Sequence, residues 1–366
     1  MIEKIHNRQL LLMLFIIRST VSIATLPVLT TGEAAQDAWA SSLLVVPGTV
    51  LIVLLVGGLG IKFKEMTVVE YSAELLGRPL GAVVSSLFLL VFLHFAATDI
   101  RVYAEVLISG FTPKTPIPFI VGIVIALAVI ASQLGIETIG RMADVLTPLF
   151  VLFIALGILG CLVTFDIQHL EPVLSRGSMP IISGALTPTA LGAKYLTLAM
   201  LIPNTTKPSK ALTYAVVSVL LSGVVLIAVA TSAVAVLGAD LSRNTVFPFF
   251  KALRSVRITQ LIQRIEALAV ISWGYGVFID VSLLLYSGAK GLSQLLGLDD
   301  YRVLLLPLAV IWGFYAVESH DTLLELMHVY RPSTLIPFVT VMVFVPYIVL
   351  WIAYLIRVRR SHGESG

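Results

Sequence analysis

The sequence predicts an all-α membrane protein with ten transmembrane helices. Hydrophobic residues make up 58% of its 366 positions, charged residues make up only 12%, and the mean hydropathy is +1.00. An ordinary soluble domain is about 25% charged, so this chain lacks the polar residues needed to cover a globule of its size. Apolar runs such as 43–60 do not alternate with polar residues, which favours membrane helices over the strands of a barrel.

The composition also excludes several other classes of protein. A single cysteine, Cys161, rules out a disulfide scaffold, and the high apolar content rules out a disordered chain. A net charge of +3, with basic residues spread along the chain, argues against a nucleic-acid partner. Lys4 and Arg8 before an apolar run resemble a signal peptide, but the run resumes after Arg18 without a clear cleavage site. We therefore expect this segment to be retained as the first span.

Each span needs roughly 20 mostly apolar residues. In chain order the candidates cover residues 9–28, 40–61, 80–109, 117–134, 143–164, 181–202, 211–237, 267–286, 302–317 and 334–356. Ten spans divide into five plus five within one transmembrane domain, residues 1–366. We expect a first repeat over about 9–164 and a second over about 181–356.

The distribution of basic residues predicts the orientation. If the N-terminus is cytoplasmic, the inside segments hold 13 Lys and Arg and the outside segments hold 8, five of them in the loop 238–266. Without that long loop the ratio is 13 to 3, so we expect both termini to be cytoplasmic. The loop 238–266 has aromatic residues followed by spaced basic ones. This pattern suits either a short amphipathic helix on the outer face or an ordinary connector.

The first spans of the two halves carry interruptions at matching places. Residues 18–22 include three hydroxyl side chains. Residues 183–189 combine Ser, Gly, Thr and Pro, and this interruption continues to Gly192 and Lys194. Broken helices at matching positions indicate a transporter-type site, although a kink without a ligand is the alternative. An aromatic residue on the third span and the glycine-containing face of the eighth complete the site. The predicted ligand-binding residues are Thr20, Ser22, Tyr103, Ala185, Thr187, Thr189, Trp273 and Gly276.

Six ionisable residues fall within spans, where each costs about 2.5–3.5 kcal/mol to insert. Three are basic and three acidic, which indicates pairing. They are Arg18, Asp99, Arg101, Glu105, Lys194 and Asp280. Arg101 and Glu105 lie one helical turn apart, so we expect a pair that is more structural than ligand-binding.

The sequence contains no motif of an enzyme or a metal site. It has no nucleophile elbow, no phosphate-binding loop and no pair of zinc-binding histidines on a helical turn. His320 and His328 lie eight positions apart among acidic residues, which is more typical of a solvated loop than of a metal centre. We therefore predict no catalytic residue, no metal and no cofactor.

Several short stretches, in this order and spacing, resemble a known family. They are GEAAQDAW (32–39), VVEYSAELLGRPLG (68–81), the Arg101 and Glu105 pair before FTPKTP (111–116), GIETIGRMADVLTPLF (135–150), LEPVLSRGSMPIISG (170–184) and RIEALAVISW (264–273). From about residue 5 to residue 350 the chain resembles the spore germination permeases, the membrane B subunits of GerA-type germinant receptors.

The resemblance carries several implications. It implies a branch of the amino acid–polyamine–organocation superfamily, with a LeuT-like five-plus-five inverted repeat and broken first and sixth helices. It implies the inner membrane of bacterial spores, a complex with a larger A subunit and a lipoprotein C subunit, and the sensing of a small nutrient such as an amino acid. Two alternatives from the residues stay open: an ion-coupled secondary transporter of an amino acid or amine, and a scaffold or ion pathway subunit.

The chain also departs from the family pattern. Where the family usually has Gly-x-Gly in the first helix, this chain has Thr20-Val21-Ser22. Where the family usually has an acid on the sixth span and a base on the eighth, it has Lys194 and Asp280. A reciprocal exchange keeps one ion pair, so we expect Lys194 to contact Asp280. The rival pairing joins Arg18 to Asp280 and leaves Asp99 for Lys194.

Overall fold

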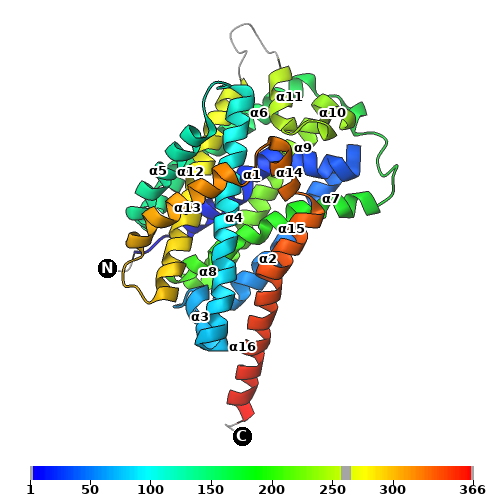
Figure 1. Cartoon of the computed structure of the whole chain (residues 1–366). Coiled ribbons are helices and arrows are strands. Elements are labelled where there is room, and N and C mark those ends of the chain that lie inside the picture. The colour runs from blue at the N-terminus through cyan, green and yellow to red at the C-terminus, as the bar shows by residue number, and fades with distance from the viewer. Residues whose placement is uncertain (1–2, 257–264, 364–366) are drawn as a thin grey trace.

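The computed structural model describes residues 3–256 and 265–363, and Figure 1 shows that they form a bundle of helices. The first half contains α1 (Asn7–Ala34), η1 (Ala35–Asp37), α2 (Ala38–Gly60), α3 (Val68–Leu76), α4 (Arg78–Gly110), α5 (Ile117–Gln133), α6 (Ile136–Cys161), η2 (Leu162–Thr164) and η3 (Ile167–Leu170). The second half contains α7 (Met179–Ala190), η4 (Leu191–Tyr195), α8 (Leu196–Leu201), η5 (Ile202–Asn204), η6 (Pro208–Lys210), α9 (Ala211–Leu237), α10 (Ala239–Arg243), α11 (Pro248–Ser255), α12 (Ile265–Leu296), η7 (Tyr301–Leu304), α13 (Leu305–Glu318), α14 (Leu323–Val329), α15 (Pro332–Val339), η8 (Thr340–Phe344) and α16 (Val345–Gly363).

The described residues contain eight helical stretches that are long and apolar enough to cross a membrane. One of them, Asn7–Gly60, holds both α1 and α2, and the apolar helix α5 adds a further segment of 17 residues. At about 1.5 Å per residue, α5 spans about 26 Å, close to the thickness of a bilayer core. Counted in this way, the segments of the described chain match the ten expected spans.

The predicted break in the first span is wrong. α1 is a continuous α-helix through residues 18–22. Two of its threonine hydroxyls bond back to the carbonyl four residues earlier, Thr20 to Ile16 (2.7 Å) and Thr25 to Val21 (3.0 Å). Such bonds satisfy a buried hydroxyl within the helix, so the polar residues here do not require unwinding.

The sixth span is interrupted, but only in the last part of the predicted stretch, around Gly192 and Lys194. α7 is helical through 183–189, and the chain tightens into the 3₁₀ segment η4 before α8 begins. Pro188 has no N–H to donate, which weakens the helix just before this point. Gly192 lies so close to α2 that an added Cβ would sit 3.0 Å from Thr49. The interruption therefore falls where a helix with a proline meets a close packing contact.

α1 runs antiparallel to α7, η4 and α8. At one end the Ile5 N–H donates to the carbonyl of Asn204 (2.8 Å), and the Thr206 N–H donates to Ile5 (2.9 Å). At the other end the Ser41 hydroxyl, near the start of α2, donates to the carbonyl of Ile181 (2.9 Å). This is the arrangement expected between the first helices of two inverted repeats.

The loop 238–266 forms two short helices, α10 and α11, and its residues 257–264 lie outside the described chain. These helices lie at the end of the molecule opposite α3 and the end of α16 (Figure 1). α11 is amphipathic as predicted, but its apolar face is buried against the protein. Phe249, Phe250 and Leu253 are all buried, and the ring of Phe250 lies 5.2 Å from that of Trp273. α11 therefore covers the bundle from this end.

Candidate functional site

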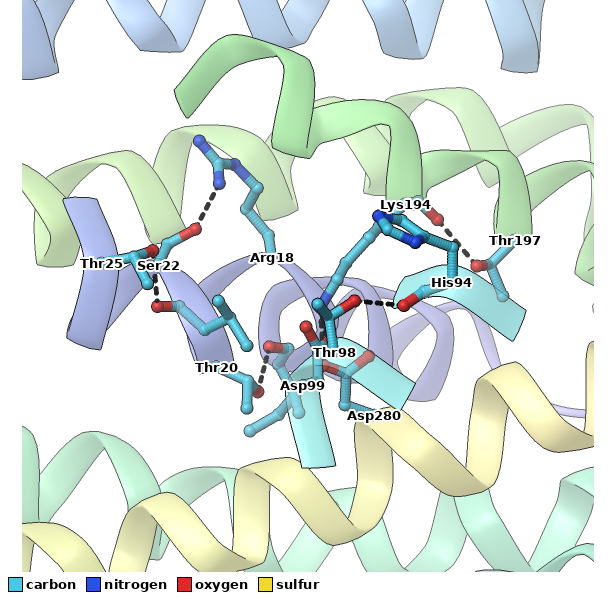
Figure 2. Close-up of polar contacts among 12 residues, drawn as sticks. Arg18, Thr20, Ser22, Thr25, His94, Thr98, Asp99, Lys194, Thr197 and Asp280 are labelled. Carbon is cyan, nitrogen blue, oxygen red and sulfur yellow. Dashed lines mark hydrogen bonds and ion pairs between the residues drawn. The ribbon is translucent and has the colours of Figure 1, made fainter. Parts of the chain in front are cut away.

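Three charged side chains meet in the interior of the bundle, and we call them the charge triad: Asp99 on α4, Lys194 on η4 and Asp280 on α12 (Figure 2). The Lys194 ammonium donates to Asp280 Oδ2 at 2.8 Å and also to Asp99 Oδ2. The Lys194, Asp99 and Asp280 side chains are only 3%, 1% and 0% exposed. The structure thus contains the expected contact between Lys194 and Asp280, with Asp99 as an additional partner.

The 3₁₀ segment η4 presents Lys194 to the other two helices. The Thr197 hydroxyl donates to the Lys194 carbonyl (2.7 Å), which supports the backbone where the α-helical pattern is lost. The ammonium also lies 5.8 Å from the centre of the Phe95 ring, one turn before Asp99 on α4. The aromatic face favours a cation. A lysine at this point of the sixth span is therefore held by two carboxylates and one ring.

Arg18 does not join the charge triad, so the rival pairing with Asp280 is wrong. Its guanidinium is buried and donates to the Ser22 hydroxyl (2.5 Å) and to the carbonyl of Pro188 (3.1 Å). Figure 2 shows it directed away from Lys194 and Asp280. Arg18 therefore joins α1 to α7. The Ser22 hydroxyl, one helical turn later on α1, accepts a hydrogen bond in the same contact.

Four of the predicted ligand-binding residues come together beside the charge triad. The Trp273 indole N–H donates to the Thr20 carbonyl (2.6 Å), and the rings of Tyr103 and Trp273 lie 5.3 Å apart, edge to face. At Gly276 an added Cβ would lie 3.0 Å from both Thr20 and Phe150. α12 is thus in direct contact with α1, and these four residues, Thr20, Tyr103, Trp273 and Gly276, form a closed junction.

The other predicted ligand-binding residues lie on α7. Ala185 and Thr187 are buried, and the Thr187 hydroxyl has no hydrogen-bond partner among the described residues. Thr189 faces α2, where its side chain would lie 2.7 Å from a Cβ added to Gly48. The predicted set therefore divides between the closed junction, the Arg18 contact and α7. The prediction had relied on unwinding at 18–22 and 183–189, which the continuous helices α1 and α7 contradict.

Two residues of the site had no signal in the sequence. Phe250 reaches Trp273 from α11, and Tyr330 lies between α14 and α15 with a buried hydroxyl that has no described partner. Burial, followed by the nearby carboxylates Asp99 and Asp280, raises the pKa of Tyr330 well above its usual range. Its hydroxyl therefore stays protonated. Neither residue lies within one of the ten predicted spans, from which the rest of the site was predicted.

Arg101 lies on α4 two positions after Asp99 but belongs to a different contact. Its Nε donates to Glu105 (3.0 Å), and its Nη1 donates to the carbonyls of Val317 (2.7 Å) and Ala316 (3.3 Å) at the end of α13. The two charged side chains are 2% and 13% exposed. A cation satisfies the free carbonyls of a helix C-terminus, so the Arg101–Glu105 pair joins α4 to α13.

The described residues do not form a metal centre. In residues 3–256 and 265–363, no three His, Cys, Asp or Glu side chains are arranged to hold an ion. The His320 ring nitrogen Nδ1 lies 2.7 Å from the neighbouring Ser319 hydroxyl. The interior contains buried charges and hydroxyls where α1, α4, η4 and α12 contact one another.

Known solved structures share this fold. Over 96% of this chain, its structure matches that of MhsT in complex with L-phenylalanine, covering 99% of that chain with a TM-score of 0.64 at 16% identity. A Na⁺-coupled sialic acid symporter matches with a TM-score of 0.65 over 91% of this chain and 77% of its own, at 10% identity. A manganese transporter of Eremococcus coleocola matches with a TM-score of 0.61 over 95% and 86%, at 15% identity. These likenesses establish a LeuT-like membrane fold.

Sequence comparisons give the family. The chain is 26% identical to spore germination protein KB of Bacillus subtilis (strain 168) over 296 residues, which is 80% of this chain and 79% of the relative. It is 26% identical to spore germination protein YndE of the same organism over 297 residues, 80% of this chain and 81% of the relative. The family model described as spore germination protein matches residues 4–322. The chain therefore belongs to the spore germination protein family of multi-pass membrane permeases.

Proposed function

We propose that this chain is the membrane B subunit of a spore germinant receptor. It would bind a small nutrient, such as an amino acid, at mid-membrane and trigger germination through a complex with a larger A subunit and a lipoprotein C subunit. The complex would lie in the spore inner membrane with both termini of this chain in the cytoplasm. The observation that carries the proposal is the charge triad beside the closed junction, in a chain of this family.

α12 gives a physical route from a ligand to the rest of the receptor. It carries Trp273 and Gly276, which close against α1, and seven residues after Trp273 it carries Asp280. Seven residues of α-helix span about 10.5 Å. A ligand that separates Trp273 from Thr20 would move α12, and with it the contact between Asp280 and Lys194. The nutrient acts by binding one of these two arrangements more tightly than the other.

Thr187 is the α7 residue best suited to contact a nutrient. Its buried hydroxyl has no described partner, so it can form a hydrogen bond with a ligand without losing one to the protein. Thr187→Val keeps the shape and removes the hydroxyl. We expect unchanged protein abundance and an about tenfold higher nutrient requirement, which corresponds to one hydrogen bond of about 1.4 kcal/mol. Thr231→Val is the matched control, because the Thr231 hydroxyl only bonds back to Ile227 on α9 (2.7 Å).

An ion-coupled transporter of an amino acid or amine is the second candidate, favoured by the fold that the chain shares with solved transporters. Both functions need a ligand cavity, so binding alone does not separate them. Proteoliposomes containing the purified chain distinguish the two. A transporter accumulates a labelled amino acid under an ion gradient, whereas a sensor binds it without accumulation. Neighbouring genes for an A subunit and a lipoprotein would favour the sensor.

Germination of spores that lack this gene, measured against a panel of amino acids and other small nutrients, tests the proposed function directly. Loss of the response to one nutrient, restored by the intact gene, is the expected result. A deletion strain that germinates normally with every nutrient, in a background without related receptors, would contradict the proposal.

A further inference from the structure

The charge triad contains one more acidic group than basic groups. It consists of two carboxylates and one ammonium group, and the side chains of Asp99, Lys194 and Asp280 are at most 3% exposed. If all three were ionised, the interior would hold a net charge of −1 away from water. An unpaired charge in such a place is costly, and proteins normally neutralise it by binding a proton or another cation.

Among the described residues, no neighbouring group supplies the missing positive charge. Arg18 on α1 is held by Ser22 and Pro188, and Arg101 on α4 is paired with Glu105. His94, also on α4, lies with its Nδ1 3.4 Å from the Tyr315 hydroxyl. Tyr330, in the segment before α15, is neutral because burial raises its pKa well above the usual range. The positive charge that balances the second aspartate must therefore come from a bound proton or another cation.

The carboxyl groups themselves show where a proton fits. Lys194 contacts the Oδ2 atom of each aspartate, whereas Asp280 Oδ1 is buried and has no hydrogen-bond partner in the described chain. Asp99 and Asp280 accept hydrogen bonds from the same Lys194 ammonium, which brings their two carboxyl groups close together and lets a hydrogen bond join them. Two ionised carboxylates cannot form such a bond, because neither has a donor. One proton between them satisfies the bond and neutralises the triad.

We propose that the charge triad is a proton-binding site, in which Asp99 and Asp280 share one exchangeable proton beside the Lys194 ammonium. The proton comes from solvent: an O–H bond forms on an aspartate oxygen, an O–H bond of hydronium breaks, and water is released. The net charge of the triad changes from −1 to zero. The inference depends only on buried charge and geometry, so it holds whether the chain is a sensor or a transporter.

The proton site links any movement of α12 to pH. If Asp280 leaves the triad and reaches water, its carboxyl group ionises at neutral pH, and Asp99 and Lys194 remain as a balanced pair. One proton is then released for each opening of the bundle. Acidic conditions favour the closed arrangement, and alkaline conditions favour the open one.

Infrared spectroscopy of the purified full-length chain in lipid nanodiscs at neutral pH tests the site. The carbonyl stretch of a protonated carboxylic acid is separate from the bands of carboxylates and amides. We expect such a band in the wild-type protein, shifted in D₂O and lost in both Asp99→Asn and Asp280→Asn, because each variant leaves a balanced pair. Glu105→Gln is the matched control and keeps the band, since Glu105 pairs with Arg101 and lies outside the charge triad.

Two outcomes would overturn the proton site. One is a wild-type spectrum without the band at neutral pH. The other is a band that persists in both asparagine variants. If an asparagine variant does not fold, Asp280→Glu replaces it, and the band must then shift in frequency without disappearing.

Discussion

Two buried ion clusters lie two residues apart on α4, and they differ in how fully their charges are satisfied. Arg101 balances Glu105 one to one, and its Nη1 donates to two carbonyls at the end of α13. The charge triad has two acids for one base and leaves Asp280 Oδ1 without a partner among the described residues. A balanced and fully bonded cluster is a structural contact, whereas an unbalanced one retains the capacity to bind something else.

The largest expected effect concerns the balanced cluster. Arg101→Ala leaves Glu105 and two helix-terminal carbonyls of α13 without their cation. Loss of one partner of a buried ion pair costs about 3–5 kcal/mol. We therefore expect a large fall in protein abundance, and with it a weaker germination response to every nutrient. Immunoblots of spore membranes measure the abundance. Normal abundance with a changed nutrient preference would show that Arg101 acts in ligand recognition.

A matched pair of amide substitutions sharpens the comparison. Glu105→Gln removes one charge from the balanced cluster and should lower stability by about 1.5–3 kcal/mol. Asp280→Asn removes the second acid of the charge triad and leaves Asp99 and Lys194 as a balanced pair, so stability should be nearly unchanged. Thermal denaturation of the purified variants in one detergent compares them. Equal losses in both would mean that charge balance does not distinguish the two clusters.

The closed junction gives a somewhat smaller effect. Gly276→Ala places a methyl group 3.0 Å from both Phe150 and Thr20, and overpacking of this kind costs about 1–3 kcal/mol. Gly122→Ala on α5 is the control, because nothing lies within 4 Å of the added atom. We expect a lower melting temperature only for Gly276→Ala. If both variants melt like wild type, α12 and α1 do not make the tight contact described.

The smallest effect is a pH dependence near the Arg101–Glu105 pair. Burial, and then the charge of Arg101, lowers the pKa of His320, although Glu325 acts in the opposite direction. The folded state therefore binds this proton less readily than the unfolded state, and stability falls as pH drops below about 6.5. His320→Gln should reduce the loss of melting temperature between about pH 8 and about pH 5.5. An identical pH profile for the variant would show that His320 does not contribute to the loss of stability at low pH.

The sequence was most informative where a local pattern allows only one arrangement of low free energy. Arg101 and Glu105 lie one turn apart on a helix, and the equal numbers of buried acids and bases indicated that Lys194 would have an acidic partner. It was least informative about contacts between distant segments. The Thr20 and Thr25 hydroxyls bond to their own helix, and composition alone does not distinguish such a helix from an unwound segment. Phe250 and Tyr330 reach the site from loops whose paths depend on the whole fold.

The central claim is that the charge triad controls the receptor, and a charge-reversal cycle in spores tests it most directly. Lys194→Glu leaves three acids, and Asp280→Lys leaves two bases for one acid, so each should impair germination. The double variant again has two acids and one base, with the acid now on η4, the base on α12 and Asp99 unchanged, and should recover a good part of the response. A double variant no better than the worse single variant would contradict the claim.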